Sequence, residues 1–224
     1  AAMLLIGASV HMAWAAEAPV TLTVLGRSTL QDSQLPLSPA DLKRLSARKQ
    51  LRVGTSDPDY PPFDISNHNH EFEGISADYL ALIGQLLTVP IHVLRYPNRT
   101  EVIQALKRGD IDLLASANGF EAADPDLLLS DPYTLDQPTL VARSNDSPLV
   151  DPSLAGKTVA MVDPYLPLSA VQAFYPEATF KLYPSILNAI GAVAFSKADL
   201  YLGDSVTASY LINKSYLNNV QLVD

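Results

Sequence analysis

The sequence predicts an α/β protein built as two lobes, each with a parallel-rich sheet covered by helices. Three observations lead to this fold class. Short, largely apolar runs with strand composition alternate with amphipathic helical segments. This alternation occurs over residues 51–116 and again over residues 157–204. Between the two series lies Pro132–Arg143, an extended, β-rich run that a proline interrupts, and we expect it to connect the lobes.

The first series is expected to form lobe one, residues 51–137. Its strand candidates are apolar toward both faces, as in a parallel sheet covered on both sides. Ser76 and Thr100 are the expected N-caps of the two intervening helices, and Gly109 is the expected end of the second. The strand candidates are Leu51–Thr55, Ile91–Tyr96 and Ile111–Ser116.

The second series is expected to form lobe two, residues 138–224, ending near a second hinge. Its strand candidates are Lys157–Val162, Thr179–Tyr183 and Leu200–Gly203, with helices between them. Val220–Asp224 is expected to begin a return of the chain to lobe one. We expect the remainder of that C-terminal return to be missing from the 224 residues.

Residues 16–50 are interpreted as an N-terminal extension. It contains a strand candidate, Val20–Leu25, and a short helix for which Ser38 is the expected N-cap. Ahead of it, Ala1–Ala15 is an apolar stretch that closes on Ala13-Trp14-Ala15, the pattern of a partial secretory signal peptide. An uncleaved membrane anchor is the alternative interpretation. The signal peptide predicts export to the periplasm.

Composition excludes several classes of function. The net charge of -9 disfavours binding to nucleic acid or to anionic lipid. The chain has no cysteine, which excludes thiol catalysis and zinc–cysteine sites. We expect no metal site and no cofactor.

The candidate ligand-binding residues follow the ends of predicted strands. In parallel sheets ligands bind beyond the carboxyl ends of the strands, so two facing lobes would share one cleft. Each candidate also has a plain structural alternative: a core aromatic, a helix cap or a turn. From the residues alone the candidates are Tyr60, Phe63, Ser116, Asn118, Asp163, Tyr165, Asp204 and Ser205.

Several of these segments resemble the family 3 bacterial extracellular solute-binding proteins. The resemblance covers the chain from Leu51 onward and rests on LRVGTSDPDYPPF, FEGISADYLALIGQLL, ALKRGDIDLLAS, LAGKTVAM and ADLYLGDSVTASYLI. The finer detail, including LGRS (Leu25–Ser28) and ANGFEA (Ala117–Ala122), is most similar to the first periplasmic sensor domain of BvgS/EvgS-type hybrid sensor histidine kinases.

The resemblance implies a type II periplasmic-binding-protein fold, the Venus flytrap. It implies a sensor input module that binds a small polar or anionic solute and acts in cis on a kinase module anchored in the inner membrane, with a homodimer formed through the parent protein. One alternative is the free solute-binding component of an ABC transporter, whose partner is a permease. A second is a dehydratase-like enzyme with Glu121 and Asp204 as its acid–base pair. We expect no catalysis by this chain itself.

The resemblance also bears on two charged residues. Asp204 matches the aspartate that binds the ligand's ammonium group in amino-acid carriers. The carriers' carboxylate-binding arginine has no counterpart in Ser116–Asp124. Arg99, at the expected start of a helix, is the candidate for a displaced anion-binding charge.

Overall fold

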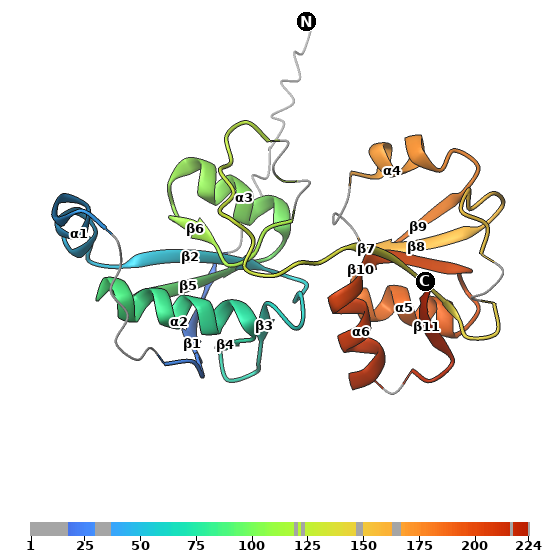
Figure 1. Ribbon diagram of the computed structural model, residues 1–224, viewed down its shortest axis with the longest axis horizontal. Coiled ribbons are helices and arrows are strands. Elements are labelled where there is room, and N and C mark those ends of the chain that lie inside the picture. The colour runs from blue at the N-terminus through green and yellow to red at the C-terminus, as the bar shows by residue number, and fades with distance from the viewer. Residues whose placement is uncertain are drawn as a thin grey trace, which may run out of the picture.

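The chain folds into two lobes that lie side by side, joined by a segment that leads from lobe one into strand β7 (Figure 1). The computed structural model describes residues 18–29, 37–118, 121, 124–146, 150–162, 167–215 and 217–223. A six-stranded sheet forms lobe one and a five-stranded sheet forms lobe two. The predicted two-lobed α/β fold class is confirmed. Ala1–Ala15 lies outside the described residues.

The sheet of lobe one has the order β3-β4-β1-β5-β2-β6. Strand β2 is parallel to both of its neighbours, β5 and β6, as the apolar composition predicted. Helices α2 and α3 lie on opposite faces of this sheet (Figure 1). The elements are β1 (Val20–Val24), α1 (Pro39–Ser46), β2 (Leu51–Ser56), β3 (Ile65–Ser66), β4 (Glu71–Glu73), α2 (Ile75–Leu87), β5 (Ile91–Tyr96), α3 (Arg99–Arg108) and β6 (Leu113–Leu114).

Strand β1 changes the interpretation of residues 16–50. It is inserted between β4 and β5, parallel to the first and antiparallel to the second. Leu22 is buried in the core of lobe one beside Val93. This part of the segment therefore belongs to the lobe. The predicted cap of the following helix α1 is confirmed, because Ser38 Oγ accepts the backbone N–H of Asp41.

Helix α2 begins two residues earlier than a Ser76 cap requires. Gly74 occupies the N-cap position with a φ of 108°, in the left-handed region that favours glycine. A Cβ at Gly74 would lie 2.3 Å from the carbonyl oxygen of Phe63, so the close approach also requires glycine. The prediction for Ser76 is wrong. Its buried side chain contacts the connector between the lobes.

Helix α3 is capped by Asn98 and not by Thr100. The Asn98 side chain accepts the backbone N–H of Glu101 at 2.9 Å, which satisfies one of the unpaired donors of the first turn. The helix ends as predicted at Gly109, which has a φ of 75° and donates back to the helix carbonyls.

The sheet of lobe two has the order β11-β7-β10-β8-β9. Strands β8, β9 and β10 are mutually parallel where they pair, and β7 is antiparallel to β10 and β11. Val220–Val223, the expected start of a return to lobe one, pairs antiparallel with β7 in a register that runs from Arg143 back to Leu140. This direction leads toward the start of β7, and the return to lobe one stays a prediction. The elements are β7 (Pro138–Arg143), β8 (Thr158–Val162), α4 (Leu168–Phe174), β9 (Thr179–Tyr183), α5 (Ile186–Ala194), β10 (Leu200–Asp204), α6 (Ser205–Lys214) and β11 (Val220–Val223).

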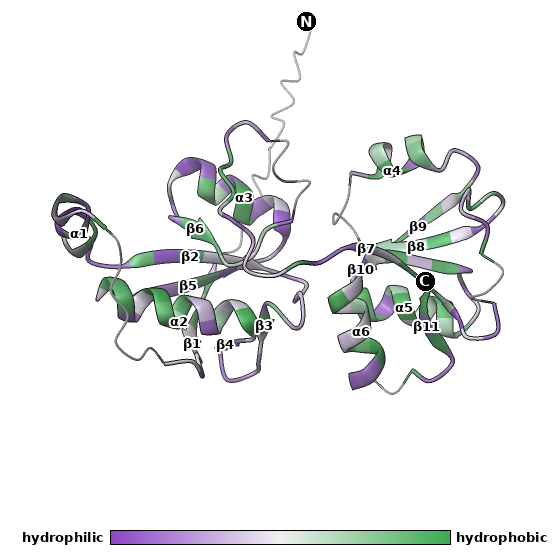
Figure 2. Ribbon diagram, viewed as in Figure 1, coloured by the Kyte–Doolittle hydropathy of each residue, from purple (hydrophilic) through white to green (hydrophobic). Residues whose placement is uncertain are grey.

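Alternation along β8 gives lobe two a core on each face of its sheet. Ala160 and Val162 pack toward α5, which is hydrophobic along most of its length (Figure 2). Val159 and Met161 pack on the opposite face with Val171 of α4. A strand buried on both faces holds its carboxyl end at a fixed place in the lobe. Within the described residues no helix is both long and apolar enough to span a membrane.

Candidate functional site

A cleft of about 560 Å³ lies between the lobes, where strands of both sheets end. Lobe one contributes the residues that follow β2 and β5, and lobe two contributes the end of β9 and the residue after it. The carboxyl ends of parallel strands thus meet from two sides, as the two-lobed fold predicts. The cleft is lined by Asp57, Pro58, Pro97, Asn98, Leu182, Tyr183 and Pro184.

Tyr60 and Asp204 bridge the two lobes. The Tyr60 hydroxyl donates a hydrogen bond to Oδ2 of Asp204, at the end of β10. The Tyr60 ring packs against the core of lobe two and stacks on Phe63, with 5.3 Å between ring centroids. Asp204 is only 8% exposed, and this burial raises the pKa of its carboxyl group to about 7. Two predicted site residues from different lobes therefore come together.

Asp204 is free to contact Tyr60 because another residue caps helix α6. Asp204 occupies the N-cap position, but its side chain makes no capping hydrogen bond. Instead Oδ1 of Asp136, in the connector, accepts hydrogen bonds from Ser205 Oγ at 2.9 Å and from the Val206 N–H at 3.0 Å. The alternative interpretation of Asp204 and Ser205 as a cap pair is therefore wrong. Ser205 instead anchors the connector to lobe two.

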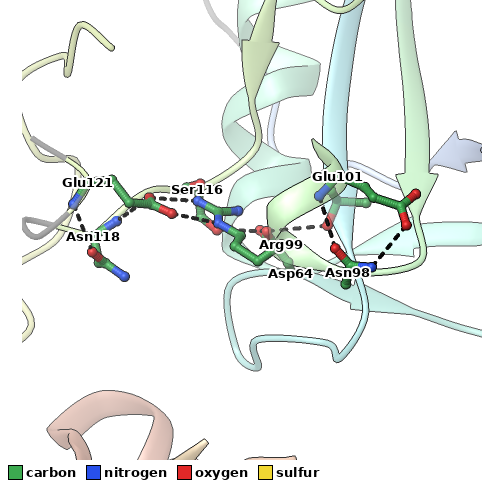
Figure 3. A network of polar contacts seen from close by, with 8 residues as sticks. Asp64, Asn98, Arg99, Glu101, Ser116, Asn118 and Glu121 are labelled. Carbon is green, nitrogen blue, oxygen red and sulfur yellow. Dashed lines mark hydrogen bonds and ion pairs between the residues drawn. The ribbon is translucent and has the colours of Figure 1, made fainter. Parts of the chain in front are cut away.

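Arg99 does not present an open positive charge to the cleft. Its Nε and Nη2 each lie 2.7 Å from an oxygen of Glu121, and Nη2 also donates to the Ser116 carbonyl at 2.8 Å (Figure 3). Glu121 in turn accepts the backbone N–H of Asn118 at 3.1 Å. The expectation that Arg99 serves as an anion-binding charge does not hold in this structure, because Glu121 already pairs with it.

Ser116 joins this ion pair to a buried carboxyl group that sequence reasoning missed. Ser116 Oγ donates to Oδ2 of Asp64 at 2.7 Å (Figure 3), and Thr55 Oγ1 approaches the same oxygen at 3.4 Å. Asp64 is 4% exposed, and desolvation raises its pKa. Its Oδ1 is buried and has no partner among the described residues. The only sequence signal was an acidic residue at the end of an apolar, proline-rich run.

Aromatic side chains attach the connector to lobe one. The hydroxyl groups of Ser76 and Tyr133 lie 3.0 Å apart, and the Tyr133 ring lies 4.6 Å from the ring of Tyr79. Burial raises the pKa of Tyr133 to about 12. Phe63, at 3% exposure, contacts the same ring edge-on. Phe63 is thus a core residue, and its predicted role as a ligand-facing wall is wrong.

The remaining predicted site residues divide into two groups. Asn118 belongs to the Arg99–Glu121 cluster, where its side chain accepts the Glu121 backbone N–H at 3.2 Å. Asp163 and Tyr165 lie outside the described residues. Sequence reasoning did not select the cleft-lining residues of β9, which look like an ordinary strand end followed by proline. Among the described residues no group of three His, Cys, Asp or Glu side chains could hold a metal ion.

Comparison with known proteins places this architecture in a family. Residues 51–215 match the bacterial extracellular solute-binding proteins, family 3. The chain is 39% identical over 213 residues to the virulence sensor protein BvgS of Bordetella parapertussis. The matched region covers 95% of this chain and 17% of that protein. It is 24% identical over 194 residues to the sensor protein EvgS of Escherichia coli K12, covering 84% of this chain and 16% of EvgS.

Solved structures agree with the sequence comparison. The crystal structure of the periplasmic domain of B. pertussis BvgS superposes with a TM-score of 0.79 at 36% identity, covering 91% of this chain and 39% of that one. An ancestral amino-acid-binding protein, a precursor of cyclohexadienyl dehydratase, superposes with a TM-score of 0.65 at 23% identity, covering 82% and 81%. The chain thus spans a small part of the sensor proteins that it matches.

Proposed function

The chain belongs to the bacterial extracellular solute-binding proteins, family 3, and from this membership we propose that it is a periplasmic sensing domain that binds a small polar solute between its lobes. The observation that carries the proposal is the cleft, whose walls come from strand ends of both sheets. Its volume of about 560 Å³ is within the range of small-molecule sites. Tyr60 and Asp204 already bridge the lobes beside it.

Closure around a solute follows from this arrangement. A single connector, held to lobe one through Tyr133 and to lobe two through Asp136, joins two separately packed cores in the described part of the chain. A solute that contacts both lobes stabilises the arrangement in which the lobes are close. Such a change in lobe arrangement is a signal that a downstream module can receive.

The parent protein is proposed to be a membrane-anchored hybrid sensor histidine kinase that receives this signal in cis. The support is the 39% identity to B. parapertussis BvgS over nearly the whole chain. A chimera in which this chain replaces the matching region of that BvgS tests the role. We expect its kinase output to change when a solute that binds this chain is added, and an output that ignores the bound solute would contradict it.

Solute binding itself is tested by a thermal-shift screen of small polar solutes with two matched variants. Leu182, which is 43% exposed, lines the cleft, whereas Leu128 is 98% exposed and is not among the cleft-lining residues. A solute at a hundred times its Kd adds roughly 2.7 kcal/mol to the stability of the folded state. We expect Leu182→Arg to abolish the response and Leu128→Arg to retain it. A response that survives in Leu182→Arg would contradict binding in the cleft.

A further inference from the structure

We infer that Glu121 determines which solutes the cleft accepts according to their charge. Because Glu121 pairs with the guanidinium group of Arg99, ligands that bind through a carboxylate are excluded. Neutral or positively charged polar solutes remain as the ligands of the cleft. The inference rests on the proposed function and names the class of solute for the same cleft. Asn98, which lines the cleft, directly precedes Arg99, the first residue of α3.

The Arg99–Glu121 contact has the geometry that a ligand carboxylate would adopt. Two guanidinium nitrogens, Nε and Nη2, each meet one carboxylate oxygen at 2.7 Å, which is the two-point arrangement of arginine with a carboxylate. Arg99 and Glu121 are each also held by a further hydrogen bond to the backbone. Arg99 is fixed by the Ser116 carbonyl and Glu121 by the Asn118 backbone N–H.

An external carboxylate would have to displace Glu121, and this exchange is unfavourable. The side chains of Arg99 and Glu121 are 20% and 12% exposed, so a displaced Glu121 would remain largely buried without its counter-ion. Glu121 also competes from within the same chain, at an effective concentration on the order of millimolar or higher. To bind Arg99, a carboxylate ligand would first have to break the Arg99–Glu121 contact. The contact that replaces it has the same chemistry.

A second ion cluster beside the cleft points to the same charge preference. Arg95 donates to the carboxylates of Asp57 and Asp59, and Asp57 lines the cleft. Together with Arg99 and Glu121, these described contacts join three carboxylates to two guanidinium groups. The sum is -3 and +2, a net charge of -1, which repels anions and attracts cations.

Glu121→Gln tests the inference because it removes the charge and keeps the size of the side chain. Succinate and L-glutamate are titrated against the wild type, Arg99→Gln, Glu121→Gln and the double variant Glu121→Gln/Arg99→Gln by calorimetry and thermal shift. We expect no response of the wild type, a gain on the order of 10- to 100-fold in succinate affinity for Glu121→Gln, and its loss in the double variant. In the solute screen, compounds that stabilise the wild type should lack a carboxylate.

Two results would overturn the inference. The first is binding of succinate or glutamate to the wild type that Arg99→Gln abolishes. The second is a folded Glu121→Gln variant that gains no succinate response. If Glu121→Gln does not fold, the Nε–H NMR signal of Arg99 in the wild type decides, because a shift on addition of succinate would show that Glu121 is displaced. A screen in which no solute binds the wild type contradicts the proposed function, whereas an Arg99-dependent succinate response in Glu121→Gln would still support the role of Glu121.

Discussion

Replacing Asp204 by asparagine removes a carboxyl group that the fold keeps away from water at the contact between the lobes. The asparagine side chain retains an oxygen that can accept the hydrogen bond of the Tyr60 hydroxyl. The substitution therefore removes the ionisation while keeping the contact. Its consequence is a change in how the free energy of unfolding depends on pH.

The magnitude follows from the pKa of Asp204, which burial raises from 3.8 to about 7. Below pH ~4 the carboxyl is protonated in both the folded and the unfolded chain, so it costs no stability. Between pH ~4 and ~7 only the unfolded chain ionises, and the free energy of unfolding falls as the pH rises. Above pH ~7 both states are ionised, and the accumulated loss stays constant at about 4 kcal/mol.

Denaturant unfolding of the wild type and Asp204→Asn at pH 4 to 8.5 measures this effect, because other groups cancel in the difference. We expect the advantage of Asp204→Asn over the wild type to grow by about 4 kcal/mol between pH 4 and pH 8. Asp131→Asn, at an exposed position directly before the connector, controls for the loss of one negative charge. A difference curve for Asp204→Asn that is flat with pH would refute the reasoning.

Three further substitutions test local parts of the account by urea denaturation. Tyr60→Phe should lower the free energy of unfolding by ~1–3 kcal/mol because it leaves a buried carboxyl group without its donor. The control Tyr79→Phe removes an exposed hydroxyl that makes one 3.4 Å contact, and it should cost less than ~1 kcal/mol. Equal losses in the two variants would argue against the Tyr60–Asp204 bridge. Arg52 lowers the pKa of Asp112 to about 2, so ionised Asp112 contributes stability that is present above pH ~4 and lost as the pH falls towards 2. Asp112→Asn should remove this contribution, and the free energies of unfolding of the variant and the wild type should match near pH 2. Asn98→Ala should cost ~1 kcal/mol through loss of the α3 cap, and no loss would place the cap elsewhere.

The fold was predictable because local composition and packing agree. Apolar runs became central strands wherever helices cover both faces of the sheet, as along β8. The pairing of β11 with β7 was not predicted, because Val220–Val223 carries no signal for its pairing partner. The pairing depends on the open edge of β7, which is distant in sequence. Strand composition predicts that a segment is extended, not which edge it joins.

Helix starts were predictable only where one capping residue was available. Ser38 stands alone ahead of Pro39 and caps α1 as expected. At α3, Asn98 and Thr100 are both good caps, and the sequence does not decide between them. At α2 the close approach of the backbone at Gly74 decides the start, and that contact arises only in the folded lobe.

The candidate site was predicted as separate residues and not as contacts. Tyr60 and Asp204 were both selected from their places after strands, but their contact joins positions 144 residues apart. Arg99 was selected for its charge, and its partner Glu121 was considered only as a catalytic acid or base. Charge type is visible in a sequence, whereas neutralisation by a distant partner depends on the path of the loop after β6.

Closure of the two lobes on a solute is the central claim, and a distance measurement across the cleft tests it most directly. The chain has no cysteine, so cysteines introduced at two exposed positions, Thr100 in α3 and Asn188 in α5, can each carry a spin label without background. Electron–electron resonance then reports the distance between the lobes with and without a solute that raises the thermal stability. The account predicts a shorter mean distance and a narrower distribution when the solute is bound. A solute that stabilises the chain and leaves the distribution unchanged would contradict it.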